Sequence, residues 1–154
     1  MSLPPPTLSP VCTLHVETHK PRDMGTAPNG VRKIIPIAGG RVTGPKIAGQ
    51  IVGVGADWQV VSGEQVAQLD ARYALETEDG AVIEIATFGY RHGPSDIIAA
   101  LGRGETPDPA DYYMRLHVRL ETGDPRYAWV NRTVFLGTGA RVAGGVEIAI
   151  FTVE

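Results

Sequence analysis

Residues 65–88 of the chain, QVAQLDARYALETEDGAVIEIATF, predict a β-hairpin and with it the class of the fold. Asp79-Gly80 is the strongest short hairpin signal, and apolar residues alternate with polar ones on both sides of it. The segments 65–77 and 81–88 are therefore expected to be antiparallel strands.

The length of the hairpin loop decides which side chains face together. If Asp79-Gly80 is a two-residue loop, Tyr73 and Phe88 share an apolar face, and Asp70 and Arg72 lie on a mixed one. A three-residue loop would reverse the faces of one strand relative to the other. The sequence leaves both registers open.

Strand patterns recur along most of the chain. A helical pattern occurs only at 95–101, where three apolar residues share one face and Ser95 could cap the helix. Residues 18–30 and 102–111 have the composition of loops, and the second loop is a candidate lid. Further strands are expected at 11–17, 31–37, 47–54, 57–61, 112–121 and 127–136, followed by a last pair that meets at Gly144-Gly145.

About eight or nine antiparallel strands in a chain of this length favour an all-β fold, a single antiparallel β-barrel over residues 11–154. Residues 1–10, with their proline run, are expected to form a flexible leader. A two-sheet sandwich is the alternative. Glycines within the predicted strands favour the barrel, because they allow a sheet to bend around a corner.

Composition excludes several classes of protein. The chain has 154 residues, 43% of them hydrophobic, which fits one globular domain. Its formal net charge of −3 gives no indication of a basic surface that would bind nucleic acid or an anionic membrane. Cys12 is the only cysteine and alternates with apolar neighbours, so we expect a small core residue, no internal disulfide and a cytoplasmic protein. No run of residues is apolar enough for a membrane span.

Known catalytic motifs are absent. The segment 39–46 resembles a phosphate-binding loop, but Pro45 replaces the lysine that such a loop requires. His15 and His19 have no third ligand at a metal-site spacing. The sequence therefore predicts no cofactor, whether metal, nucleotide or flavin.

Polar residues in otherwise apolar strands are the candidates for a site. In one interpretation, Arg72 and Arg115 hold an anion or carbonyl in a pocket while Asp57 acts as a base. In the other, arginine–aspartate pairs tie the barrel rims and the aromatic residues fill the core. The catalytic candidates are Asp57 and Tyr113, and Tyr113 would donate a hydrogen bond to an enolate. The candidates for binding a ligand are Trp58, whose ring would stack on the ligand, Asp70, Arg72, Arg115, Trp129 and Asn131.

The order of short motifs resembles that of a bacterial and fungal family known as domain of unknown function 3237, or uncharacterised protein family 0311. The segment 93–111 is longer and more helical than expected of that family. The resemblance implies a barrel of the lipocalin-like or allene-oxide-cyclase-like kind with a pocket, and no established reaction. It is carried by Ile35-Pro36-Ile37-x-Gly39-Gly40, Gly44-Pro45, Gly53-x-Gly55-Ala56-Asp57-Trp58, Asp70-Ala71-Arg72-Tyr73, Thr77-x-Asp79-Gly80-Ala81, Tyr113-x-Arg115, Leu120-Glu121-Thr122 and Tyr127-x-Trp129-x-Asn131.

Three functions fit these features. The first is binding of a small, partly apolar organic molecule that carries a carboxylate or carbonyl. The second is a cofactor-independent isomerase, cyclase or lyase that uses the same pocket. The third is a structural or interaction protein with a filled barrel. A homo-oligomer, most simply a dimer, is an additional expectation.

Overall fold

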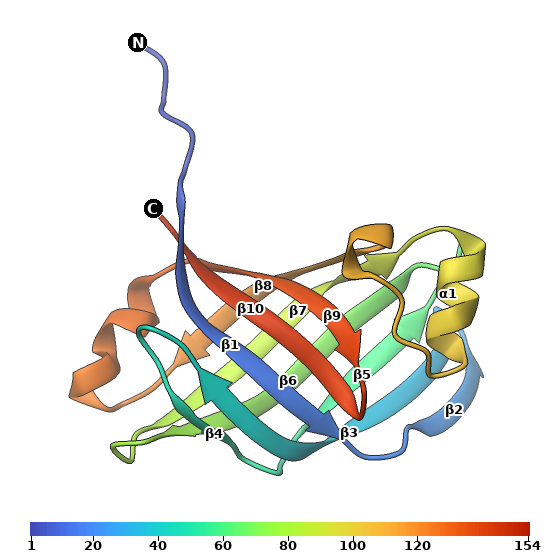
Figure 1. Ribbon diagram of the computed structural model, residues 1–154, viewed down its shortest axis with the longest axis horizontal. Coiled ribbons are helices and arrows are strands. Elements are labelled where there is room, and N and C mark those ends of the chain that lie inside the picture. The colour runs from blue at the N-terminus through green and yellow to red at the C-terminus, as the bar shows by residue number, and fades with distance from the viewer.

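The computed structural model describes all residues, Met1–Glu154, and its strands form an antiparallel barrel (Figure 1). The order around the barrel is β1-β10-β9-β8-β7-β6-β4-β3, and the pairing of β1 with β3 closes it. Strands β4 and β5 fill successive parts of one position between β3 and β6, which gives a closed barrel of eight strands. The predicted all-β barrel is confirmed.

The strands cover most of the chain, and β6, β7 and β8 alternate regularly between buried and exposed or half-buried residues. Strand β2 pairs only with β3, outside the closed circuit. The strands are β1 (Leu8–Thr18), β2 (Arg22–Ala27), β3 (Gly30–Thr43), β4 (Gly49–Ile51), β5 (Ala56–Val61), β6 (Ala67–Thr77), β7 (Val82–His92), β8 (Tyr113–Glu121), β9 (Phe135–Val142) and β10 (Gly145–Val153).

Close approach of β1 to its two neighbours requires glycine on both sides. A Cβ atom at Gly145 of β10 would lie 1.8 Å from the carbonyl oxygen of Val16, and one at Gly40 of β3 would lie 2.0 Å from that of His15. Gly40 also has a φ of +134°, a conformation that other residues rarely adopt. Glycine at these two positions allows β1 to pair with both β3 and β10, and this pairing closes the barrel.

The β6–β7 hairpin has a three-residue loop, not a two-residue one. Glu76 pairs with Val82, and the Thr77 N–H donates to the Ala81 carbonyl at 2.8 Å, so residues 78–80 form the loop. Odd-numbered residues of both strands consequently face the interior. Phe88, which the two-residue register placed on the inner face, lies on the outer face and is 39% exposed.

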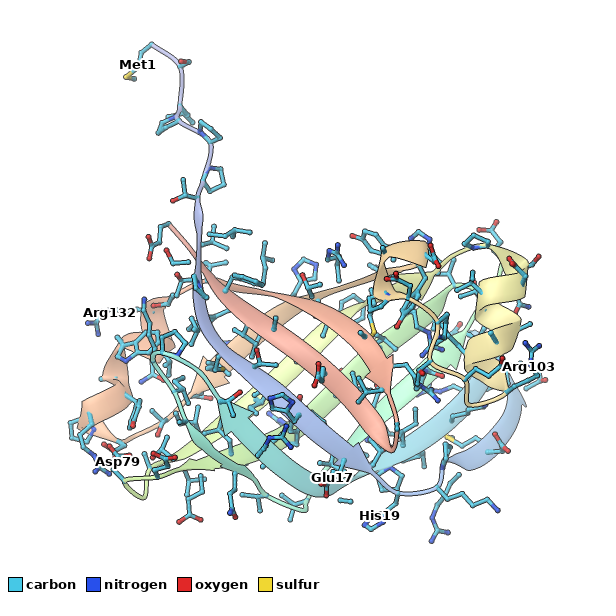
Figure 2. All side chains as sticks on the ribbon, viewed as in Figure 1. Met1, Glu17, His19, Asp79, Arg103 and Arg132 are labelled. Carbon is cyan, nitrogen blue, oxygen red and sulfur yellow. The ribbon has the colours of Figure 1, made fainter.

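Three predicted segments differ from the structure. The segment 127–136, expected to be a strand, begins with a 3₁₀ helix, η2 (Pro125–Arg132), because the Asp124 side chain accepts the Arg126 N–H at 2.9 Å and a proline follows it. The loop expected at 18–30 contains β2. Strand β1 begins at Leu8, within the predicted leader, and the preceding residues project from the barrel with Met1 at the tip (Figure 2).

The predicted helix is present as α1 (Ser95–Gly102). Leu101 is buried and Ile97 and Ile98 pack against the core, as their shared face predicted, but Ser95 makes no capping hydrogen bond and Pro94 is the cap residue. A short 3₁₀ turn, η1 (Pro109–Asp111), follows. Neither α1 nor the 3₁₀ turns reach the length and apolar character that crossing a bilayer requires.

The two ends of the barrel are different. At one end, η2 covers the opening: Val130 is fully buried, and the Trp129 ring lies 6.0 Å from that of Phe135. At the other end lie α1, β2 and the β9–β10 hairpin, and Figure 2 shows Arg103 there, opposite Asp79 and Arg132. Cys12 is buried in the core, as predicted. The barrel is packed toward η2, and its space for a ligand lies toward α1.

Candidate functional site

A cavity of about 340 Å³ occupies the barrel toward its α1 end. Small-molecule sites have volumes of about 300–1,000 Å³. Its apolar wall comes from inward-facing residues, which include Leu69 of β6, Met114 and Leu116 of β8, and Ile148 of β10. The lining also includes His19 and its neighbours in the β1–β2 connection and Gly144 and Gly145 of the β9–β10 hairpin, and we call this end of the cavity its mouth.

Seven polar or charged side chains of the strands line this apolar space. The strand pairing orders four of them by depth across three adjacent strands. Arg91 lies level with Ala67 near the mouth, and Asp57 and Thr87 flank Ala71 farther in. Tyr73 is one inward-facing position deeper, level with Ile85. The seven are Thr18 of β1, Asp57 and Gln59 of β5, Tyr73 of β6, Thr87 and Arg91 of β7, and Arg141 of β9.

Asp57 is the only carboxylate that lines the cavity. Its Oδ1 accepts the backbone N–H of Asp70 at 2.9 Å, at a point where β5 and β6 interrupt their pairing. Burial raises the pKa of Asp57, and this effect outweighs the lowering by the Asp70 N–H and by the charge of Arg91. The cavity therefore holds a carboxyl group that takes up a proton more readily than one in water.

Arg91 and Arg141 bring two positive charges to the mouth of the cavity. Neither has a carboxylate oxygen within 4.0 Å of its side-chain nitrogens, and Arg91 Nε is buried with no hydrogen-bond partner. Burial lowers the pKa of Arg91, and the charge of Arg141 lowers it further. Two guanidinium groups, opposed only by the more distant charge of Asp57, make this region favourable for an anion.

Tyr73 places an unpartnered hydroxyl group at the inner end of the polar set. The residue is 4% exposed, and its oxygen has no hydrogen-bond partner in the protein. Burial raises the pKa of Tyr73, and the charge of Asp57 raises it further, so the hydroxyl keeps its proton at neutral pH. It is available to donate to a ligand oxygen.

A second space of about 680 Å³ adjoins the first beneath α1. The two spaces share Ile35, Gln59, Arg91 and Arg141 among their lining residues. We call the first space the inner chamber and the second the outer chamber.

Of the residues predicted for a site, only Asp57 lines the inner chamber. Trp58, its neighbour on β5, points outward and is 48% exposed, because side chains alternate along the strand. Asp70 and Arg72 lie at even positions of β6, which face solvent, and Arg72 Nε pairs with Glu84 at 3.2 Å. The hypothesis that an arginine pair at Arg72 and Arg115 forms the pocket is therefore wrong.

Tyr113 and Arg115 occupy the outer face of β8, since the even-numbered residues of that strand are the buried ones. The guanidinium of Arg115 lies 5.6 Å from the centre of the Tyr113 ring, and that ring stacks on His92 at 4.7 Å. These contacts are among surface residues. The structure gives neither residue access to the inner chamber.

Trp129 and Asn131 belong to η2, at the covered end of the barrel. Asn131 accepts the backbone N–H of Thr122 at 2.9 Å and donates to its carbonyl at 2.8 Å, which ties η2 to the end of β8. Trp129 packs on Phe135. Both side chains lie away from the lining of the two chambers.

The sequence reasoning missed Arg91, Arg141, Tyr73, Gln59 and Thr87. Arg91 continues the inward series of β7 once a three-residue loop is assumed, and an arginine on the apolar side of a strand is then a clear signal. Arg141 follows two inward-facing glycines of β9, the first strand of the pair that was expected to meet at Gly144-Gly145, and glycines give no apolar alternation that would indicate which face Arg141 takes. No three His, Cys, Asp or Glu side chains lie together as a metal site would need.

The sequence of residues 6–153 matches the profile of a family described as a protein of unknown function, DUF3237. The chain belongs to the DUF3237 family. This DUF3237 chain is 43% identical over 129 residues, 84% of each sequence, to the UPF0311 protein RPA1785 of Rhodopseudomonas palustris.

Solved structures share the barrel of this DUF3237 chain. The crystal structure of RPA1785 superposes with a TM-score of 0.93 at 38% identity, covering 99% of this chain and 100% of the other. A β-barrel-like protein of Acinetobacter baumannii gives 0.87 at 38% identity, with 99% of each chain covered. An enzyme from Penicillium herquei gives 0.76 at 18% identity, covering 100% of this chain and 98% of the other, a likeness of fold alone.

Proposed function

We propose that the barrel binds a small organic anion with an apolar body. The observation that carries this proposal is the pair Arg91 and Arg141 at the mouth of a cavity with an apolar wall, where neither guanidinium has a carboxylate oxygen within 4.0 Å. A carboxylate or enolate placed between them supplies the missing partner. The apolar body of the ligand then replaces water against Leu69, Met114 and Leu116.

This cavity argues against a barrel that is solidly filled and serves only as a structural or interaction protein. The proposed partner is this small molecule alone, and the proposal includes no nucleic acid, membrane surface or cofactor. We propose the cytoplasm as the location, because the only cysteine is buried and can form no disulfide within the chain.

The test uses a panel of arylalkanoates from benzoate to 4-phenylbutanoate, each compared with its neutral amide by titration calorimetry. We expect at least one carboxylate to bind, and its amide to bind about 10- to 100-fold more weakly, because hydrogen bonds to a charged group contribute about 1.5–3 kcal/mol. Arg91→Met should reduce carboxylate binding to the level of the amide.

Arg72→Met is the matched control, since it removes an exposed guanidinium of the outer face. It should leave binding unchanged. If no carboxylate of the panel binds at millimolar concentration, or if Arg72→Met weakens binding as much as Arg91→Met, the proposal is wrong.

A second candidate function is proton transfer without a cofactor, as in an isomerase, cyclase or lyase. It is favoured by the position of Asp57 between Arg91 and Tyr73 in depth, with a pKa that burial raises. With the ligand carboxylate at the arginines, Asp57 faces the middle of the ligand and Tyr73 its far end. Asp57 takes a proton from a carbon next to a ketone. The C–H electron pair then forms the C=C bond of an enolate, and the π pair of the ketone moves to its oxygen, to which Tyr73 donates.

The probe for this reaction is 3-benzoylpropanoate, whose carboxylate, acidic methylene and ketone follow in that order. Exchange of the methylene hydrogens in deuterium oxide, followed by proton NMR, should be faster with the protein than with buffer and should be lost in Asp57→Asn. Exchange that persists in Asp57→Asn would eliminate this residue as the base.

A further inference from the structure

The excess of positive charge in the two chambers is larger than one anionic group can neutralise. Asp57 is the only acidic side chain among the lining residues. The cationic side chains that line the chambers are Lys20, Lys33, Arg91, Arg103 and Arg141. The chain as a whole carries a net charge of −3, so this concentration of cations is local.

The cations are divided between the chambers. Arg91 and Arg141 line both, whereas Lys33 of β3 and Arg103, just after α1, line only the outer chamber. Lys33 has no carboxylate within 4.0 Å, although Asp23 lies opposite it on β2. Arg103 Nε pairs with Glu105 in an exposed contact, and Glu105 is not among the residues that line either chamber. The outer chamber thus presents positive charge beyond the arginine pair.

The remaining lining of the outer chamber suits a polar extension of the ligand. Gln59, Gln65 and Ser95 provide hydrogen-bonding groups there, and α1 covers them with Ile98 and Leu101. By contrast, the inner end of the inner chamber has an apolar wall in which the Tyr73 hydroxyl is the hydrogen-bond donor. An elongated ligand would therefore place its apolar end inside and its more polar end beneath α1.

We propose that the ligand class is an elongated organic acid with two anionic groups: one bound by Arg91 and Arg141 at the junction of the chambers, and a second, carboxylate or phosphate, bound in the outer chamber by Lys33 and Arg103. This inference rests on the proposed function, because it takes the arginine pair as the first anion site. It adds a second site that the single-carboxylate ligand does not use.

The test compares three probes with one aromatic body. These are 3-phenylpropanoate, benzylsuccinate, which adds a second carboxylate, and the half-amide of benzylsuccinate in which that second carboxylate is neutral. Benzylsuccinate should bind about tenfold more tightly than its half-amide at low salt. The advantage should decrease as salt is added, because part of the outer chamber is open to solvent.

Variants assign this advantage to the outer chamber. Lys33→Met and Arg103→Met should each reduce the preference for benzylsuccinate over the half-amide and leave 3-phenylpropanoate binding unchanged. Arg132→Met, which removes an exposed guanidinium at the opposite end of the barrel (Figure 2), should change none of the three affinities.

The outcomes separate this inference from the proposed function. If 3-phenylpropanoate binds in an Arg91-dependent manner but benzylsuccinate and its half-amide bind equally, the second site is wrong and the proposed function stands. If none of the probes binds at millimolar concentration, both fail. If benzylsuccinate gains affinity that Lys33→Met does not reduce, the second anionic group lies elsewhere and the assignment to the outer chamber is overturned.

Discussion

The hydroxyl of Tyr73, which has no hydrogen-bond partner, should lower the free energy of unfolding of the protein. A buried polar group with no hydrogen-bond partner costs about 1–3 kcal/mol. Tyr73 meets both conditions, since it is 4% exposed and its oxygen has no partner in the protein. Tyr73→Phe removes the oxygen and keeps the ring against the core, so it should stabilise the protein by about that amount.

The corresponding change in melting temperature can be measured by calorimetry. For a domain of about 150 residues, 1 kcal/mol corresponds to about 2–4 °C, so Tyr73→Phe should raise Tm by about 2–12 °C. The same variant should bind ligands with a carbonyl or hydroxyl at the inner end more weakly, because they lose a donor.

Tyr112→Phe is a control of opposite sign. Tyr112 is similarly buried, at 7% exposure, but its hydroxyl accepts the backbone N–H of Arg141 at 2.9 Å. Its removal leaves that N–H without its partner and should destabilise the protein by about 1 kcal/mol. If Tyr73→Phe instead lowers Tm as Tyr112→Phe does, the Tyr73 hydroxyl has a stabilising partner and the reasoning is refuted.

Two further predictions concern pH. Because burial raises the pKa of Asp57, its ionised form costs stability as the pH rises above 3.8, the ordinary value. Asp57→Asn should therefore raise Tm at pH 7 and have a smaller effect at pH 4 in thermal melts; an equal effect at both would contradict this cause. Hydrogen bonds from Thr77 at 2.5 Å and from Tyr127 at 2.9 Å lower the pKa of Asp79 below its ordinary value of 3.8. The ionised carboxylate therefore stabilises the folded protein at pH values above 3.8, and this stabilisation is lost as the pH falls through the lowered pKa. Asp79→Asn should accordingly be less stable than the wild type at pH 6, and the gap should narrow toward pH 3 in urea titrations.

The sequence was sufficient to predict the barrel, because the features that specify its strands and turns lie within short segments of the chain. Alternating residues, the Asp79-Gly80 turn and glycines within strands each specify a strand, a hairpin or a bend. Asp124-Pro125 is equally local and indicates the start of η2, but the apolar residues that follow favoured a strand and concealed it.

The site could not be predicted in the same way, because it depends on register. One additional residue in the β6–β7 loop moves Arg91 to the inner face and leaves Arg72 on the outer one. The sequence alone does not distinguish an arginine inside a barrel from one on its surface. Asp57 was found because it is a charged residue in an otherwise apolar strand, and in the structure it falls on the inward-facing side of β5.

The polar groups of the inner chamber lie on different walls, with Asp57 on β5, Tyr73 on β6, Arg91 on β7 and Arg141 on β9. Four contacts that do not all lie in one plane distinguish a molecule from its mirror image, since only one form can satisfy all of them together. The barrel should accordingly be stereoselective. Of the two enantiomers in racemic benzylsuccinate, one should be bound and the other left in solution.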